Sequence, residues 1–418
     1  MTTLPDTSNP FPENVDQVFT HCRMATMAKG TYGIMENAAL AVSGKSIAWI
    51  GPMDALPETF DTIQVTDCRN QWILPGFVDC HTHLIWAGSR AKEFEMRLAG
   101  ASYADIAKAG GGIISTVTAT RAADEKTLFD LAFQRMAHFL TQGITTVEIK
   151  SGYGLNLASE LKMLAVAGRL KKACPQHVSA TFLGAHALPP EFSGRPDDYI
   201  QEVISVMLPA VKDQGIATAV DAFCEAIAFS REQTRQVFET AIALGFAVKL
   251  HAEQLSNSRG TALAAEMGAL SCDHLEYLST DGAEKMAAHG TVAVLLPGAF
   301  YYLKETRVPP VDIFRRLRIP MAVATDLNPG SSPVHSMIPV LNMACLLFGL
   351  TCEEALAGAT IHGAKALGLG DRKGSLEPGK DADFVIWDVA SPADLCYLTG
   401  ITPVKMVVIE GRTEHQSV

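Results

Sequence analysis

The strongest constraint on the fold of this chain is a regular alternation of two kinds of segment between about residue 76 and residue 328. One kind is short and apolar, has the length of a strand and is rich in β-branched residues. The other kind is longer and amphipathic, as a surface helix is. The short runs are Gly76–His83, Ile144–Lys150, Val178–His186, Ala219–Glu225, Ala247–His251, Leu270–His274, Val292–Leu296 and Met321–Asp326. The helix-like stretches include Glu160–Lys172, Asp198–Gln214, Arg231–Leu244 and Thr280–His289.

Strands that alternate with helices predict a parallel sheet. Eight such repeats in roughly 250 residues are typical of a (β/α)8 barrel, which is the fold we expect. The competing fold is an open, doubly wound sheet, which usually carries a glycine-rich turn after its first strand. We find no such turn in the sequence, and this favours the barrel.

The two flanks of the repeat region share a β character that the middle of the chain lacks. Ala39–Ile50 reads as a hairpin with its turn at residues 43–45, and Ala382–Asp388 and Val404–Glu410 read as further strands. The flanks could be two unrelated additions, but chain ends often lie close together, so we expect one small composite β-sandwich domain. The helical stretch Cys352–Leu367 would connect it to the barrel. The predicted division is residues 1–75 and 363–418 for the small domain and 76–362 for the barrel.

Composition and charge exclude several classes of protein. The chain has 418 residues and a formal net charge of -11, with no basic cluster that would suit nucleic acid. No apolar stretch approaches the roughly 20 residues of a membrane-spanning helix. The first basic residue is Arg23, so we expect no signal peptide. The nine cysteines contain no Cys-x-x-Cys pair, which argues against disulfides or a thiolate zinc site and favours the cytoplasm.

Polar residues stand at the ends of most of the predicted strands, where a buried strand would not normally tolerate them. In a barrel, the carboxyl ends of the strands form the face that carries the active site. Seven of the eight runs end in this way, in His81-Thr82-His83, Glu148-Ile149-Lys150, His186, Glu225, His251, His274 and Asp326.

Four of these residues suit a metal ion. His81 and His83 are two positions apart, so both imidazoles project from one face of a strand. A lone His-x-His can be a chance pair, but His251 and Asp326 stand at equivalent heights in their own strands. Together they predict a site of three histidines and one carboxylate with room for water. Imidazole ligands suit both zinc and iron, so the metal itself stays open.

Two further residues, Glu253 and His274, have both a functional and a structural interpretation. Glu253 could move a proton between the attacking water and a leaving nitrogen, or it could be a helix N-terminal carboxylate. His274 could assist a reacting carbonyl, or it could be a hydrogen-bonded core histidine. Asp326 could both bind metal and carry protons. For Lys150 we expect a structural ion pair with Glu148 or a neighbour, and hence a single metal ion.

The sequence resembles the amidohydrolase superfamily. The resemblance covers nearly the whole chain and depends on Leu74–Gly76, Phe77–His83, Asp326 and Gly374–Asp383. Within the superfamily, four longer strings resemble the imidazolonepropionase family, whose members open a ring in histidine degradation. These strings are Thr145–Leu155, Phe182–Pro189, Lys249–Gln254 and Ala324–Ser332.

The resemblance implies one zinc or iron ion per subunit, held by His81, His83, His251 and Asp326. It also implies substrate contacts from Arg90, Tyr153, His186, Gln254, Asn328, Gly330 and Ser331, and Tyr103 is a weaker candidate. Chemistry agrees at Arg90, which follows the metal pair by seven residues and could grip a carboxylate with two parallel hydrogen bonds.

The implied reaction is hydrolysis of the cyclic amide C–N bond of 4-imidazolone-5-propanoate, which gives N-formimidoyl-L-glutamate. We expect Glu253, His274 and Asp326 to be catalytic, a small-molecule substrate, and a homodimer without nucleic-acid or membrane partners. Two alternatives stay open. One is a deaminase of the same superfamily that acts on a heteroaromatic ring amine, and the other is a catalytically silent scaffold.

Overall fold

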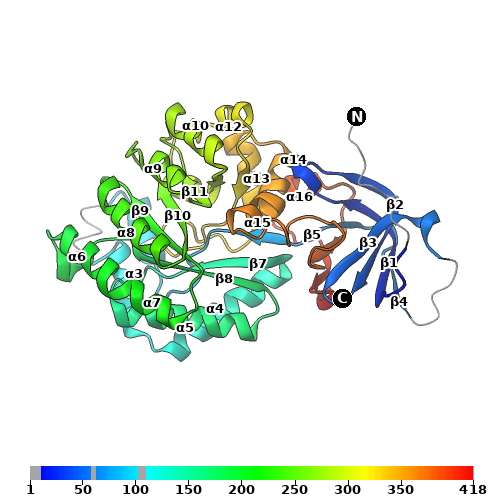
Figure 1. Cartoon of the computed structure of the whole chain (residues 1–418), viewed down its shortest axis with the longest axis horizontal. Helices are drawn as coiled ribbons and strands as arrows, with labels where there is room; N and C mark the ends of the chain where they lie inside the picture. The colour runs from blue at the N-terminus through cyan, green and yellow to red at the C-terminus, as the bar shows by residue number, and fades with distance from the viewer. Residues whose placement is uncertain (1–10, 58–62, 102–109, 418) are drawn as a thin grey trace.

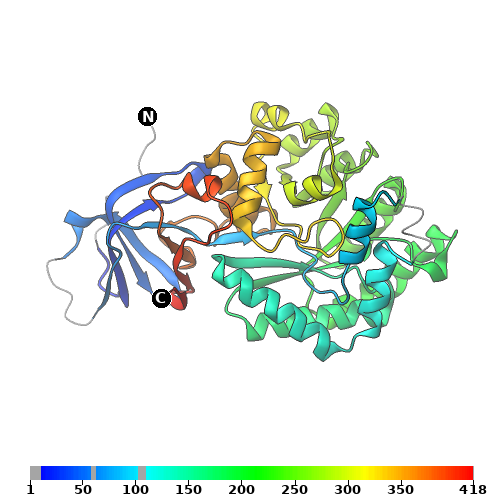
Figure 2. The same ribbon diagram turned by 180° about the vertical axis from the view of Figure 1, so that it is seen from behind.

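The computed structural model describes residues 11–57, 63–101 and 110–417 and contains two separate eight-stranded sheets. Figure 1 shows the larger sheet ringed by helices in one lobe and the smaller sheet, built from the blue and red ends of the chain, in the other. Figure 2 shows the same two lobes from behind. Among the described residues, no helix is both long and apolar enough to cross a membrane.

The larger sheet is the predicted barrel. Its strands are β6 (Phe77–Asp79), β7 (Ile144–Lys150), β8 (His177–Ala185), β9 (Ala219–Cys224), β10 (Ala247–Ala252), β11 (Ser271–His274), β12 (Val292–Leu295) and β13 (Met321–Val323). Every neighbouring pair is parallel, and the strands lie in chain order. The two outer strands meet through a parallel bridge between Thr82 and Leu327. This bridge closes the barrel, so the open-sheet alternative is wrong.

Helices cover the outside of the barrel between successive strands. They are α1 (Ala91–Leu98), α3 (Ile113–Ala122), α4 (Glu125–Thr141), α5 (Leu157–Ala173), α6 (Pro196–Glu202), α7 (Leu208–Gln214), α8 (Arg231–Ala243), α9 (Gly260–Glu266), α10 (Thr280–His289), α11 (Pro297–Leu303) and α12 (Val311–Leu317). After β13 follow α13 (Met337–Phe348), α14 (Cys352–Ala357), the π-helical turn η5 (Gly358–His362) and α15 (Gly363–Ala366). The last three occupy the predicted stretch Cys352–Leu367.

The first and last barrel strands are shorter than the runs that predicted them. β6 ends at Asp79 and β13 at Val323, although the apolar runs extend to His83 and Asp326. The reason is that the chain leaves the regular ladder at these ends. The Asp326 amide donates to the His81 carbonyl at 3.0 Å, and the His83 amide donates to the Leu327 carbonyl at 3.0 Å. The two segments therefore close the barrel outside the regular strands.

The smaller sheet joins both ends of the chain, as predicted. Its strands are β1 (Gln17–Ala25), β2 (Ile34–Ser43), β3 (Ser46–Pro52), β4 (Gln64–Asp67), β5 (Trp72–Pro75), β14 (Phe384–Trp387), β15 (Val404–Ile409) and β16 (Arg412–Gln416). β5 pairs with β1 on one side and with β14 on the other, which joins the two flanks. The sheet encloses its own core, in which the rings of Phe19 and Phe384 lie 4.9 Å apart.

The barrel contacts the smaller sheet through large apolar side chains. Trp387 of β14 lies with its ring 5.1 Å from the ring of Phe77 in β6. Gly143, with φ +79, precedes β7, and a Cβ atom there would lie 2.9 Å from the Trp387 ring. The predicted boundary at residues 75 and 76 falls between β5 and β6, and the division into domains at 75/76 and 362/363 remains our proposal.

Candidate active site

A cavity of about 550 Å³ lies at the carboxyl ends of the barrel strands. This volume is in the usual range for a small-molecule site. Its lining includes eleven residues that the sequence singled out, namely His83, Arg90, Tyr153, His186, His251, Gln254, His274, Asp326, Asn328, Gly330 and Ser331. The fold therefore brings residues from six barrel strands and their loops to one place.

Four side-chain donor atoms converge at the floor of this cavity. Asp326 Oδ1 lies 3.4 Å from His81 Nε2 and 3.5 Å from His83 Nε2. His83 Nε2 in turn lies 3.3 Å from His251 Nε2. All four side chains are buried, and His81 Nε2 has no hydrogen-bond partner. Facing imidazole nitrogens at this spacing need a proton or a cation between them.

Two further carboxylates orient the imidazoles toward this point. Asp273 Oδ2 lies 2.5 Å from His81 Nδ1, and Asp221 Oδ2 lies 3.0 Å from His251 Nδ1. The hydrogen bond between Asp273 and His81 Nδ1 fixes the hydrogen there and leaves Nε2 free to bind a metal, while Asp221 is only in contact with His251 Nδ1. Burial also lowers the pKa of His81 well below its usual range, so its ring is neutral, as a metal ligand must be. These residues fit a divalent metal ion.

A buried network of charges supports the two orienting carboxylates. Lys150 Nζ lies 2.8 Å from Glu148 Oε1 and 2.8 Å from Asp221 Oδ2. Lys249 Nζ lies 2.9 Å from the same Glu148 oxygen. This confirms the ion pair expected for Lys150, which holds Asp221 in place and is itself fully buried. Three carboxylates, including Asp273, thus face two lysines, and Asp326 adds a further negative charge that a divalent cation would balance.

The three residues predicted to be catalytic share a backbone conformation that is rare outside glycine. Glu253 and Asp326 both have φ +51, and His274 has φ +83. Such conformations cost on the order of 1–3 kcal/mol each and persist where the surroundings enforce them, often at functional sites. All three lie at or just beyond the ends of barrel strands, so the cavity face carries part of the backbone strain in this chain.

Glu253 directs its carboxylate away from the cavity lining. Its Oε1 accepts a hydrogen bond from the Gly260 amide at 2.8 Å, and its Oε2 accepts from the amide of Thr261 at 3.2 Å and from the Thr261 hydroxyl. Gly260 and Thr261 begin α9. The Glu253 carboxylate therefore binds the N-terminus of a helix, as the structural interpretation of this residue expected. Its catalytic role remains a prediction.

His274 remains close to the proposed ligands. Its ring centroid lies 5.5 Å from that of His251 and 5.9 Å from that of His81, and the three residues form a second possible ligand group. Its Nδ1 is buried without a hydrogen-bond partner. This ring can therefore either join the metal site or contact a substrate oxygen beside it.

Arg90 lies at the side of the cavity against the loop that follows β13. Its Nη2 is 2.7 Å from Glu93 Oε2, and its Nε is buried without a partner. Gly330 approaches so closely that a Cβ atom there would lie 2.7 Å from Arg90 Nη1. Arg97 also reaches this loop, with Nη2 3.5 Å from the Gly330 carbonyl oxygen. The sequence did not identify Glu93 or Arg97, whose contacts depend on how α1 packs.

Tyr153 and His186 form an aromatic wall next to His83. The His186 ring stacks on the His83 ring with centroids 5.0 Å apart, and Tyr153 lies 5.7 Å from His83. His186 Nδ1 donates to the Gly152 carbonyl at 2.9 Å, which leaves Nε2 as an acceptor. Burial lowers the pKa of His186 to about 4, so the ring is neutral near pH 7.

The loop after β13 is held by the side chain of Asn328. Its Oδ1 accepts from the amides of Gly330 at 2.8 Å and Ser331 at 2.7 Å, and its Nδ2 donates to the Asp326 carbonyl at 2.7 Å. Asn328 therefore shapes the loop, and the substrate contacts implied for these residues remain predictions.

Apolar residues complete the cavity, and sequence patterns did not identify them as lining residues. Phe223, Ile227, Leu303 and Ile113 line it together with Gln254, whose side chain was implied by resemblance. Tyr103, the weaker candidate, lies outside the described residues.

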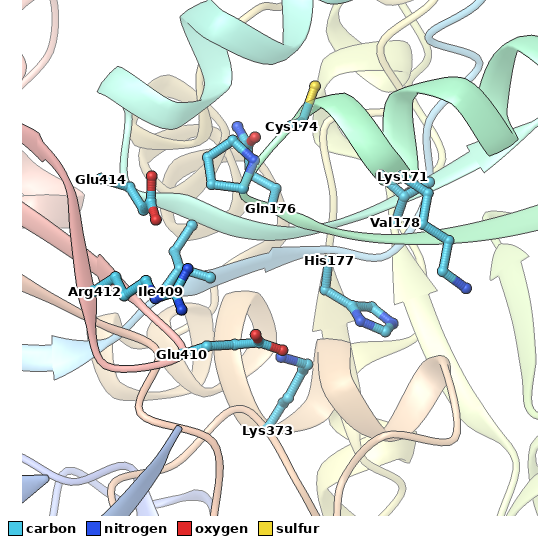
Figure 3. Close-up of a pocket in the computed structure, with 11 residues that line it drawn as sticks. Lys171, Cys174, Gln176, His177, Val178, Lys373, Ile409, Glu410, Arg412 and Glu414 are labelled. Atoms are coloured by element: carbon cyan, nitrogen blue, oxygen red, sulfur yellow. The ribbon is translucent and has the colours of Figure 1, made fainter. Parts of the chain in front are cut away.

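A second cavity, of about 320 Å³, lies at the opposite end of the barrel, beside the start of β8. Figure 3 shows its lining, which combines His177 and Lys171 with Lys373, Glu410, Arg412 and Glu414 from the end of the chain. Two of its charged residues are already paired: Lys373 Nζ lies 2.5 Å from Asp383 Oδ2, and Glu410 Oε2 lies 2.5 Å from Lys45 Nζ.

Comparison with known proteins agrees with this geometry. The amidohydrolase family profile matches residues 72–413. An imidazolonepropionase of Shewanella putrefaciens (strain CN-32) is 54% identical over 406 residues, which cover 96% of this chain and 99% of that protein. The imidazolonepropionase of Shewanella baltica (strain OS185) is 53% identical over the same shares.

Solved structures show the same fold at low identity. A zinc-bound adenosine deaminase from Xanthomonas campestris superposes with a TM-score of 0.72 at 20% identity, over 97% of this chain and 94% of that one. An atrazine chlorohydrolase from Arthrobacter aurescens complexed with zinc has a TM-score of 0.73 at 17% identity, over 95% and 94%. The profile and the close relatives agree: this chain belongs to the amidohydrolase family and, within it, to the imidazolonepropionases.

Proposed function

We propose that this chain hydrolyses the ring amide of 4-imidazolone-5-propanoate to N-formimidoyl-L-glutamate in histidine degradation. The observation that carries the proposal is the convergence of His81, His83, His251 and Asp326 at the floor of a cavity that has Arg90 on its wall. Relatives that share more than half of their residues with this chain are imidazolonepropionases.

For the metal, we propose one zinc or iron ion per chain, since imidazole and carboxylate ligands suit both. When bound, a divalent ion supplies Lewis-acid activation of water and of a carbonyl oxygen. His81, His83, His251 and Asp326 would hold it, and Asp273 and Asp221 would keep two of the imidazoles in the correct tautomer.

The residues of the chain would perform the remaining work. Arg90 would bind the propionate and place the ring carbonyl at the cavity floor. Asp326 would accept a proton from the attacking water and return it to the ring nitrogen as the C–N bond breaks. Its carboxylate lines the cavity, whereas that of Glu253 is bonded to α9, which favours Asp326 for this step. His274 would donate a hydrogen bond to the developing oxyanion.

The test is loss of imidazolonepropanoate absorbance by the purified chain before and after chelation, with elemental analysis of bound metal. We expect about one zinc or iron per chain, with turnover that chelation abolishes and metal restores. Turnover without metal would overturn the proposed site. Bound metal with no turnover of this substrate would overturn the proposed reaction.

The two alternatives raised by the sequence have less support. A ring-amine deaminase would not need the cation at Arg90, and the likeness to an adenosine deaminase at 20% identity concerns the fold alone. Guanine, cytosine and adenosine, assayed in parallel, would give no ammonia. A silent scaffold would not need the four converging donors.

The homodimer and the cytoplasmic location also remain proposals. Sedimentation of the purified chain at several concentrations would detect the dimer, and fractionation of cells that express it would test the location.

A further inference from the structure

Three cysteines that are far apart in the sequence, without the spacing of a metal-binding motif, meet at the junction between the barrel and the smaller sheet. Their sulfur atoms, from Cys345, Cys352 and Cys396, all lie within 4.8 Å of one another. Each comes from a different helix: α13, α14 and α16 (Asp394–Tyr397). Figure 1 shows the three helices together beside the smaller sheet, and each pair is in contact.

The local structure explains why these sulfurs meet. Gly349, with φ +70, ends α13, and Thr351 caps α14 with a reciprocal bond to Glu354, so a tight turn sets Cys352 beside Cys345. The Asn342 amide on α13 donates to the Cys396 carbonyl at 2.8 Å and fixes α16 against α13. The cluster is thus built on hydrogen-bonded helix ends.

We propose that Cys345, Cys352 and Cys396 form a second metal site, separate from the active site, that takes one thiophilic divalent ion such as Zn²⁺ or Cd²⁺. Three sulfurs at a Zn–S distance of about 2.3 Å are about 4 Å apart, so the cluster needs only a small contraction. Soft thiolate donors select such ions over Mg²⁺ or Ca²⁺. Binding replaces three S–H protons by three metal–sulfur bonds and releases the protons to solvent, and water fills the fourth position.

Solvent access agrees with this role. Cys345 and Cys352 are partly exposed, whereas Cys396 is buried, so an ion can enter from solvent and reach the inner sulfur. The described cysteines are all free, so no disulfide competes for these sulfurs.

The alternative is that the three cysteines are only small apolar residues in a helix junction. Cadmium distinguishes the two, because cadmium thiolates absorb in the ultraviolet by charge transfer from sulfur. The proposed active-site ligands are nitrogen and oxygen and cannot give that band. The experiment is a Cd²⁺ titration of the reduced, full-length protein loaded with only one zinc ion per chain, followed by ultraviolet absorbance and thermal unfolding.

We expect the band to saturate at one Cd²⁺ per chain and Tm to rise, since the ion ties α16 to α13 and α14. Cys345→Ser and Cys352→Ser should each remove most of the band and the Tm rise, while Cys174→Ser, a partly buried cysteine outside the cluster, should change neither. Hydrolysis of imidazolonepropanoate should be retained in all three variants, which shows that they fold. A wild-type protein without a saturable band, or a band that survives in both cluster variants, would overturn the proposal.

Discussion

The cavities at the two ends of the barrel differ in what their charged groups do. At the carboxyl end, imidazole nitrogens and a carboxylate are buried and converge on one point, and His81 Nε2 has no hydrogen-bond partner. At the opposite end, Lys373 and Glu410 are already paired with neighbours, and Arg412 and Glu414 are exposed. Titratable residues in a cavity are therefore not enough for a site. Buried ligand atoms that converge on one point, with further carboxylates beside the imidazoles, are what distinguish the first cavity.

Removal of one histidine from each cavity should show this difference most strongly. His251→Ala takes away a proposed ligand, and we expect kcat/KM to fall by at least about 10³-fold together with metal content. His177→Ala at the other end should leave both unchanged. Steady-state kinetics and elemental analysis check this pair, and comparable losses in the two variants would contradict the comparison.

The orienting carboxylates provide the next test. Asp273→Asn keeps the shape of the side chain but removes the charge beside His81 Nδ1. We expect a 10- to 100-fold loss of metal affinity or activity, roughly the effect of such changes at other metal sites. Asp381→Asn, which breaks an ion pair with Arg372 far from the cavity, is the matched control. If metal affinity in the Asp273 variant equals that of the control, the carboxylate does not orient the ligand.

Arg90 should affect substrate binding rather than metal binding. For Arg90→Met, we expect KM to rise about tenfold with metal content retained, because a charged hydrogen bond to the propionate is lost while Arg97 remains nearby. Arg412→Met removes a guanidinium from the other cavity and should leave KM as it is. An unchanged KM in the Arg90 variant would mean that another group binds the propionate.

The smallest expected effect is on the stability of the protein at low pH. Burial, with Lys373 nearby, lowers the pKa of His177 to about 4 from its usual value of about 6.5. As the pH falls from about 6.5 toward about 4, the unfolded chain binds this proton first, so stability is lost in that window. His177→Gln should reduce the loss between pH 7 and pH 5 by about 2 kcal/mol, as measured by urea unfolding. A parallel loss in both proteins would show that His177 does not contribute.

The sequence predicted the barrel because strand and helix periods alternate locally, and each run carries its own signal. It predicted His81 and His83 because two positions along a strand share a face whatever the neighbours are. It did not predict Asp221 or Asp273, since their contacts with the histidines depend on which strands pair. Glu253 shows the opposite error. Its position after β10 suggested that its carboxylate faces the cavity, but a left-handed backbone conformation turns the carboxylate toward α9.

Spacing along the chain could not reveal the cluster of cysteines. The lack of a Cys-x-x-Cys pair argued against a thiolate site, and helix packing brings three sulfurs that are distant in the sequence within 4.8 Å of one another. Only the tertiary arrangement of α13, α14 and α16 carries that information.

The line along which the barrel closes passes through the proposed metal site, so the stability of that line should depend on the metal ion. Two backbone hydrogen bonds join the first and last strands: the Asp326 amide donates to the His81 carbonyl, and the His83 amide donates to the Leu327 carbonyl. Both come from the segments that hold the proposed metal ligands. An ion that bridges those side chains would also fasten the two edges of the sheet. The protein stripped of metal should then open first along this line, with faster amide exchange and earlier proteolysis there than elsewhere in the barrel.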